Sequence, residues 1–202
     1  MSDKIMVKFL LLLTLALAYA GCEEVIYTPK PRAFPKIEFP QGSNYQQFDQ
    51  EFCNFTFQYP EYAQVIRDKT YFEDAPPNTC WFDIQVPQLA SKIHFTYYPI
   101  QNSTDFQQLT GDAFRLAQEH NKKANYIDEL PIQKKNVGGF VFDIDGEVAS
   151  PFQFYLTDST QHFLRGALYF DAQARPDSLA PAYDFMKKEI LKMIDTFAFN
   201  KE

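Results

Sequence analysis

Serine, aspartate and histidine stand close together in residues 157–162, as Asp158, Ser159 and His162. These side chains perform acyl transfer when the histidine is held over the serine, with an oxyanion hole beside them. The chain contains no Gly-x-Ser-x-Gly sequence, which is typical of a serine nucleophile between a strand and a helix. Aspartate and serine between two apolar runs are also good turn formers. We therefore interpret this segment as a turn and assign no catalytic residue.

The histidines His94, His120 and His162 are further candidates for chemistry, because imidazole is a common metal ligand. They stand far apart, and none belongs to a His-x-x-x-His pair or a comparable carboxylate spacing. We expect each to be a partly buried side chain with a hydrogen-bond partner. The sequence therefore predicts no metal site and no bound cofactor.

Cys22 ends a segment with the pattern of an export leader. Lysines near the start are followed by the apolar run 9–18 and then by Tyr19-Ala20-Gly21-Cys22. The apolar run is too short to cross a hydrocarbon core of about 30 Å comfortably as a helix. A cysteine after Ala-Gly resembles the lipobox of bacterial lipoproteins, although Tyr19 stands where leucine is usual. The resemblance implies a signal peptide over residues 1–21 and lipid on Cys22; ordinary secretion with a free cysteine is the alternative.

The remaining cysteines, Cys53 and Cys80, form a pair in a chain that we expect to be exported. A disulfide is the default interpretation of such a pair. A two-thiol metal site and a redox pair are the alternatives, and both favour a Cys-x-x-Cys spacing that Cys53 and Cys80 do not have. We therefore predict a disulfide between them.

The composition is that of a folded core, with 46% hydrophobic and 17% aromatic residues. The formal net charge is −7, which disfavours nucleic acid as a partner because phosphates need a basic face. An acidic surface is also repelled by anionic lipid heads. Attachment to a membrane would therefore come from the N-terminal lipid, since several acyl chains give stable anchoring.

Proline density separates the leader from the rest of the chain. Pro29, Pro31, Pro35 and Pro40 disfavour helix and favour extended backbone. We interpret residues 22–45 as a lipidated N-terminus and a Pro-rich tether, in which residues 37–39 are a candidate edge strand. Residues 46–202 are then a single α+β domain, long enough to bury a sizeable core.

Alternation of apolar and polar residues predicts strands over residues 55–59, 81–86 and 92–97. Residues 137–142 and 148–156 are predicted as the two strands of a hairpin, and residues 162–170 as a further strand rich in Phe, Leu and Tyr. Asp145-Gly146 is a strong hairpin signal. Residues 143–147 also resemble half of a calcium loop, but such loops lie between helices, whereas this segment lies between strands.

Two amphipathic patterns predict helices. Residues 106–124 place apolar side chains at steps of three or four, with an N-cap among residues 103–105. Residues 179–197 do the same, with a cap at residue 177 or 178. The order of strands, helix, strands and helix, joined by tight turns, predicts an α+β fold with an antiparallel β-sheet flanked by helices.

Several segments together resemble a known family. They are residues 27–32 after the lipobox, Cys53 with residues 55–60, Cys80-Trp81, residues 120–124 and, most specifically, residues 153–170. Together they are similar to the gliding motility lipoprotein GldD, from Cys22 almost to the C-terminus. Residues 33–36 depart from the family pattern, which affects only the tether. The element order also resembles the PsbP/Mog1-like sandwich fold, and that likeness says nothing about activity.

The resemblance implies a part of the gliding machinery of Gram-negative bacteria, which is coupled to the type IX secretion system. We expect a non-enzymatic, lipid-anchored protein of the cell envelope that faces the periplasm, at the outer rather than the inner membrane. Its partners would be the membrane, through the lipid, and other gliding and type IX secretion lipoproteins or motor proteins. No nucleic acid is expected.

The candidate partner contact is the turn and strand of residues 157–170, with Asp158, Ser159, His162 and Arg165. Arg165 stands among large apolar residues, where a charge needs a partner or the surface. A periplasmic binding module for a small apolar or lipid ligand is one alternative function, and a large, dry, aromatic pocket would favour it. An envelope hydrolase is the other, and it would need Asp158, Ser159 and His162 to converge in a pocket.

Overall fold

The computed structural model describes residues 6–8, 36–67 and 78–200. Residues 6–8 are helical and belong to one unit, Met1–Phe34, whereas Pro35–Glu202 forms a second, compact unit. Most of the leader 1–21 lies outside the described residues, and so do Cys22 and residues 23–35 of the tether. No helix that the structure describes is long and apolar enough to cross a bilayer. Lipidation and the boundaries of the leader and tether stay predictions.

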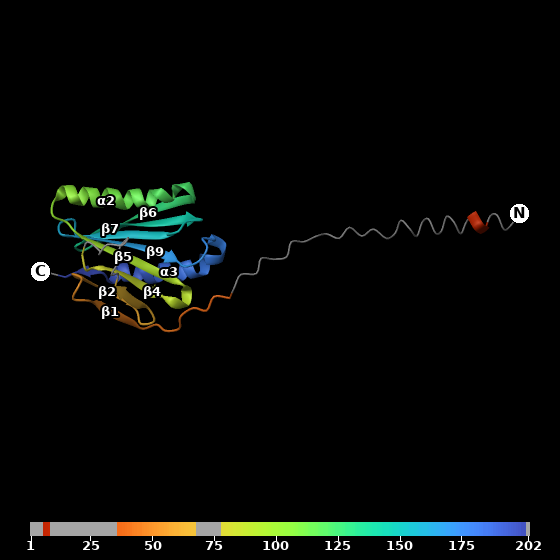
Figure 1. Cartoon of the computed structure of the whole chain (residues 1–202), viewed down its shortest axis with the longest axis horizontal. Coiled ribbons are helices and arrows are strands. Elements are labelled where there is room, and N and C mark those ends of the chain that lie inside the picture. Colours follow the sequence, from red (N-terminus) through yellow and green to blue (C-terminus); the bar gives the residue numbers. More distant parts are fainter. Residues whose placement is uncertain (1–5, 9–35, 68–77, 201–202) are drawn as a thin grey trace. The chain divides into compact units, whose positions relative to one another are not determined.

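The compact unit has an α+β order of elements (Figure 1). In chain order they are β1 Tyr45–Asp49, β2 Phe55–Pro60, β3 Gln64–Arg67, β4 Trp81–Val86, the 3-10 helix η1 Pro87–Leu89, β5 Ser91–Pro99, α2 Ser103–Gln118, the 3-10 helix η2 Glu119–Lys122, β6 Ala124–Lys134, β7 Val137–Gly146, β8 Phe152–Thr157, β9 His162–Phe170, α3 Pro176–Thr196 and β10 Ala198–Phe199. The strands form two antiparallel sheets, ordered β1-β2-β10 and β3-β4-β5-β9-β8-β7-β6.

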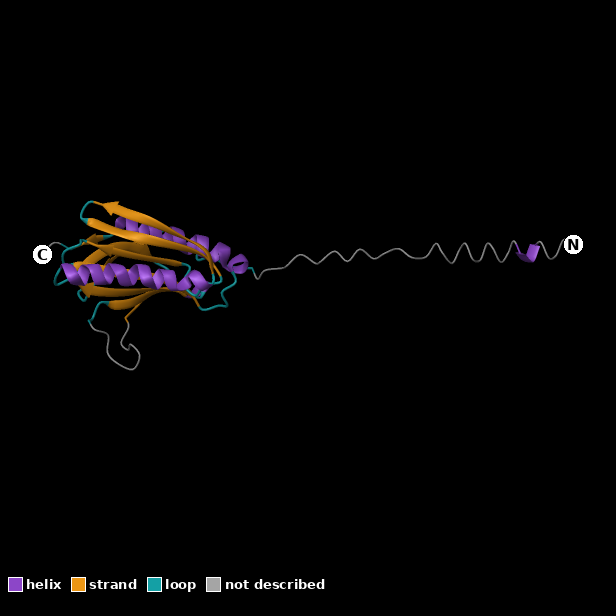
Figure 2. Cartoon of the chain, turned by 90° about the horizontal axis from the view of Figure 1, so that it is seen from above, coloured by secondary structure: helices purple, strands orange, loops and turns teal. Residues whose placement is uncertain are grey.

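The larger sheet is covered on both faces. Its layers appear in Figure 1, with α2 on one side and α3 with the small sheet on the other. Under α2, side chains of β7, β8 and β9 form one core cluster. On the other face, α3 and the small sheet close over a larger core. Both helices run roughly along the strands (Figure 2), and the sheet flanked by helices is the fold class that the sequence predicts.

Stacked phenylalanine rings connect the two sheets. Phe57 on β2 stacks on Phe48 of β1 with a centroid distance of 4.6 Å. Phe48 stacks on Phe82 of β4 at 4.7 Å, and Phe82 stacks on Phe95 of β5 at 4.8 Å. All four side chains are almost fully buried. Such aromatic pairs each contribute about 0.5–1.5 kcal/mol beyond the burial of their area.

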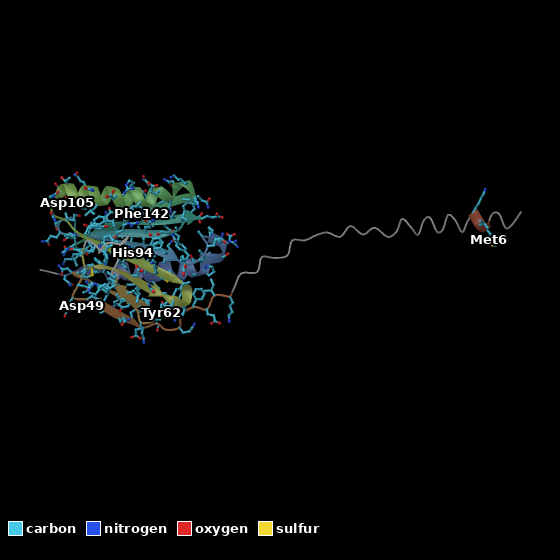
Figure 3. The ribbon with its side chains drawn as sticks, viewed as in Figure 1. Met6, Asp49, Tyr62, His94, Asp105 and Phe142 are labelled. Carbon is cyan, nitrogen blue, oxygen red and sulfur yellow. A yellow bond between two sulfur atoms is a disulfide. The ribbon has the colours of Figure 1, made fainter. Side chains whose placement is uncertain are left out.

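Cys53 and Cys80 also join the two sheets, through the predicted disulfide. Cys53 lies in the connection between β1 and β2, and Cys80 directly precedes β4. Their Cα atoms are 5.1 Å apart, and the bond is drawn in yellow in Figure 3. Both side chains are buried. The crosslink therefore fixes the small sheet against the large one.

Four strands of the structure are not predicted from the sequence: β1, β3, β6 and β10. The longest is β6, an edge strand with mostly exposed or half-buried side chains, so no clear apolar-polar alternation marks it. It tolerates Pro131 because a proline without an N–H group can sit on an edge strand. Conversely, residues 37–39 form no strand, although Ile37 and Phe39 pack against the core.

The hairpin between β7 and β8 is longer than predicted. β7 ends at Gly146, and β8 begins at Phe152 rather than at residue 148. Gly146 has φ +140°, and a Cβ atom there would lie 2.4 Å from the Lys123 carbonyl oxygen. The glycine is therefore needed both for its backbone conformation and for the close approach of the chain that enters β6.

The helix ends also differ from the prediction. The N-cap of α2 is Asn102, whose side-chain oxygen accepts hydrogen bonds from the N–H groups of Thr104 and Asp105. α3 begins at Pro176, a turn earlier than its apolar stripe suggests, and no side chain caps it. Pro181 consequently lies inside this helix, where its ring is exposed.

Candidate functional site

Asp158 organises the turn between β8 and β9. Its Oδ1 atom accepts hydrogen bonds from the backbone N–H groups of Thr160 at 3.0 Å, Gln161 at 2.9 Å and His162 at 2.9 Å. Burial alone would raise the pKa of Asp158, but these hydrogen bonds outweigh it and hold the pKa below its usual value. Ser159 takes a left-handed conformation with φ 65° in this turn. The predicted turn is therefore present at residues 158–161, since Thr157 still belongs to β8.

His162, the first residue of β9, is buried directly after this turn. Its ring is 5% exposed, its Nδ1 atom lies 2.7 Å from the Tyr97 hydroxyl, and it stacks on Phe199 at 4.9 Å. Among the described residues, no hydrogen bond joins this ring to the side chain of Asp158 or Ser159. None of these three residues lines the two cavities described below. The three do not converge in a pocket as a serine hydrolase would require.

His162 and Arg165 lie on opposite faces of the large sheet. β9 is its central strand, and residues three apart on a strand point to opposite sides. His162 faces Tyr97 and Phe199 on the side of the small sheet, whereas Arg165 faces α2. The predicted contact segment 157–170 is therefore no continuous surface, because most of β9 is buried and only the turn is exposed. Whether its polar residues contact a partner stays a prediction.

A groove of about 700 Å³ runs between α2 and the face of β4, β5 and β9 that is turned toward α2. We call it the α2 groove. The apolar stripe of α2 packs mainly over β7, β8 and Phe163 of β9. The helix therefore covers β4 and β5 less completely on the same face of the sheet, which leaves the groove. Its lining combines aromatic, apolar and charged side chains, among them Trp81, His94, Tyr98, Leu116, Arg165 and Tyr169.

At one wall of the α2 groove, His94 is paired with Asp83. These residues face each other across β4 and β5, and the His94 Nδ1 to Asp83 Oδ1 distance is 2.6 Å. Lys92 lies 3.2 Å from the other oxygen of the same carboxylate. Burial alone would raise the pKa of Asp83, but His94 and Lys92 outweigh it and lower the pKa. His94, labelled in Figure 3, is thus held by a carboxylate on the neighbouring strand.

Arg165 is a half-buried cation of the α2 groove. Its Nη2 atom donates a 2.7 Å hydrogen bond to the Gln153 Oε1 atom on β8. Within the described part of the chain, no carboxylate lies within ion-pair distance of this guanidinium. Burial lowers the pKa of Arg165, while Tyr169 and Tyr98 act in the opposite direction. A guanidinium with unused donors in a partly buried groove is suited to hold an anion.

The protein-family model of the gliding motility lipoprotein GldD matches residues 24–199. The chain belongs to this family. It is therefore a gliding motility lipoprotein, and its family implies a membrane-anchored location in the cell envelope. The matched segment contains part of the predicted tether, both sheets, both long helices, the disulfide and the α2 groove.

Comparisons with individual proteins add little to the family. No curated protein matches the chain. Among solved structures, it is similar to the solution structure of cyanobacterial PsbP (CyanoP) from Synechocystis sp. PCC 6803, with 11% identity and a TM-score of 0.44. That match covers 81% of this chain and 98% of the other.

A second cavity, of about 850 Å³, lies at the end of the sheet where α3 begins. η2, the connection between β7 and β8, and the N-terminal part of α3 line it. Here Asp143 on β7 accepts hydrogen bonds from the Tyr183 hydroxyl and the Lys187 ammonium group. Burial and then Asp143 raise the pKa of Tyr183. The Asp143 carboxylate is therefore already hydrogen-bonded to both of these donors.

The three histidines lie in different places. His94 is in the α2 groove, His162 is under the turn after β8, and His120 is in η2, beyond the end of α2. Burial and then the positive charge of Arg165 lower the pKa of His120. No cluster of three or more metal-ligating side chains occurs in the regions 36–67 and 78–200.

The sequence singles out Arg165 by its large apolar neighbours, but it does not indicate which residues surround Arg165 in the fold. Asp83, His94 and Gln153 carry no motif, and the first two meet only because β4 pairs with β5 in one register. Alternation along the predicted strands 81–86 and 92–97 assigns Asp83 and His94 to their polar faces. Only the pairing of the strands places them side by side.

Proposed function

We propose that this lipoprotein supports gliding motility, and the type IX secretion system coupled to it, through protein contacts rather than by catalysis. In this proposal, lipid on Cys22 anchors it, facing the periplasm, at the outer rather than the inner membrane. The family match over residues 24–199 carries the proposal, because it extends over nearly the whole chain after the leader. The proposed partners are other lipoproteins or motor proteins of the same machinery.

The free edge of β6 supports a role in protein contacts. β6 is the last strand of the large sheet, and its outer edge pairs with no strand that the structure describes. Tyr126 and Leu130 on this strand are 57% and 54% exposed. An extended partner segment can add to such an edge through backbone hydrogen bonds and bury apolar side chains. The exposed part of the turn at Asp158 and Ser159 is a second candidate contact.

The test is deletion of the gene in a gliding host, followed by complementation with wild type, Cys22→Ala or Thr28→Ala. Spreading and secretion are scored together. We expect deletion to abolish both, wild type and Thr28→Ala to restore them, and Cys22→Ala to fail, with immunoblots confirming equal protein levels. Thr28→Ala is the matched control, since it changes the same N-terminal segment but keeps the thiol. Normal spreading and secretion in the deletion strain would contradict the proposal.

The binding module is a second candidate, and the α2 groove favours it. Its volume of about 700 Å³ is within the usual range of small-molecule sites, about 300–1,000 Å³. The lining is not dry and aromatic throughout, because Asp105, Asp112 and Arg115 on α2 and Arg165 on β9 belong to it. A ligand of this groove would therefore carry a charged group as well as an apolar part.

A further inference from the structure

Arg165 places a positive charge in the α2 groove that no described side chain neutralises. Arg165 is half-buried, so its charge is only partly solvated, and a guanidinium has five N–H donors in a planar fork. One of these donors is used in the bond to Gln153, and the fork matches a carboxylate in two parallel hydrogen bonds. The remaining donors can therefore bind an anionic ligand.

The carboxylates of the α2 groove are engaged elsewhere, so none supplies that anion. Asp83 holds His94 and Lys92. On α2, Asp112 pairs with Arg115 at 3.1 Å, and Asp105 accepts a hydrogen bond from the Gln101 N–H group. These acidic groups disfavour a dianion relative to a monoanion, because their repulsion increases with the charge of the ligand.

The remaining lining fits an apolar body beside the charged group. Leu109 and Leu116 of α2 face Tyr98 and Tyr169 across the groove, all partly buried, and Trp81 lies behind them with its ring edge-on to Tyr98 at 5.6 Å. Apolar walls of this kind gain free energy by removing a ligand's apolar surface from water. The volume of the groove suits one small molecule.

We propose that the α2 groove binds a small organic monocarboxylate with an apolar body, whose carboxylate pairs with the Arg165 guanidinium. The tyrosine and leucine side chains hold the apolar part. This inference rests on the second candidate function, the binding module, and names its ligand class; it is independent of the proposed role in gliding motility.

The test uses Trp81, the only tryptophan of the chain, as a reporter inside the groove. Full-length protein in a non-ionic detergent is titrated with cyclohexanecarboxylate while tryptophan emission is recorded. Cyclohexanecarboxamide is the neutral probe of the same shape, and inorganic phosphate is the dianion. We expect a saturable change with the carboxylate, and affinities lower by on the order of tenfold or more for the amide and the phosphate.

Variants then test whether the Arg165 guanidinium binds the carboxylate of the ligand. Arg165→Gln should weaken carboxylate binding on the order of tenfold or more, and Arg165→Lys should weaken it less, because it keeps the charge but loses the fork. Arg175→Gln is the matched control, since it removes an exposed arginine that does not line the α2 groove and should leave the affinity unchanged. Melting curves show whether each variant is folded.

The proposal is overturned if the carboxylate causes no saturable change, or if amide or phosphate binds as tightly as the carboxylate. Equal losses of affinity in Arg175→Gln and Arg165→Gln would also overturn it, since they would indicate attraction by surface charge. The comparison of the probes on the unchanged protein decides the question even where Arg165→Gln does not fold.

Discussion

Arg165 and His162 stand on the same strand, three residues apart, and serve opposite faces of the large sheet. His162 contacts the Tyr97 hydroxyl and the ring of Phe199 beside the small sheet. Arg165 donates a hydrogen bond to Gln153 on the side of α2. Variants at the two positions therefore report on separate environments: His162 on the packing next to the turn, and Arg165 on the α2 groove.

The disulfide is expected to contribute strongly to stability. Replacing both Cys53 and Cys80 by serine should lower the free energy of unfolding by about 3–4 kcal/mol, since the crosslink closes a loop of 27 residues. Chemical denaturation of the variant and the wild type measures the difference. Cys22→Ser is the control, because it removes a thiol outside this loop. An unchanged free energy of unfolding in the double variant would contradict this role.

Asp158 should make the stability depend on pH in the acidic range. Its folded pKa is lowered, so its contribution is present above the ordinary aspartate pKa of about 4 and is lost as the pH falls through the folded pKa. Urea denaturation between about pH 5 and pH 2 should show a smaller loss for Asp158→Asn than for wild type. Asp49→Asn, at an exposed position on β1, should keep the wild-type slope. Equal slopes for wild type and Asp158→Asn would remove the basis of this assignment.

Gly166 should not tolerate a side chain. A Cβ atom there would lie 2.2 Å from the Phe154 ring on the adjacent strand, so the ring must move. Gly166→Ala should therefore destabilise the protein by about 1–3 kcal/mol. Gly111→Ala is the matched control, because its Cβ meets nothing within 4 Å in α2 and should stabilise the helix by up to about 1 kcal/mol. Thermal melting compares the two, and a lower melting temperature for Gly111→Ala than for Gly166→Ala would refute the prediction.

The edge of β6 should matter for partners rather than for folding. Leu130→Lys puts a charge on an edge strand, which discourages the addition of another strand. We expect reduced spreading of the complemented host with unchanged melting of the purified protein. Leu191→Lys on α3, where the leucine is 43% exposed, is the control and should leave spreading normal. Full spreading of the Leu130→Lys strain would exclude this edge as a required contact.

His120 should add a second pH dependence, near neutrality. Its folded pKa is lowered, so the unfolded chain binds its proton more readily, and stability should rise with pH through about 6.5. His120→Gln should flatten this rise in denaturation curves measured between about pH 5 and pH 8. The same slope in variant and wild type would show that His120 is not its source.

Local patterns of the sequence determined most of the elements and one covalent link. The strands around Phe57, Ile84 and Phe95 were predicted because each buries mainly one face, and burial of one face produces alternation. The strand around Leu164 is largely buried on both faces and was predicted from its Phe, Leu and Tyr content. The same argument fails for β6, whose two faces are both largely exposed. The lone pair of cysteines left after Cys22 was sufficient to predict the disulfide.

Tertiary structure alone decided which side chains meet. Arg165, Leu116 and Tyr98 come from β9, α2 and β5, and no local pattern relates their positions. The disulfide was predicted from composition, but that it fixes one sheet to another follows only from where β1, β2 and β4 lie. Periodicity reports whether a side chain is buried, whereas strand order and register, set by packing over the whole chain, determine its neighbours.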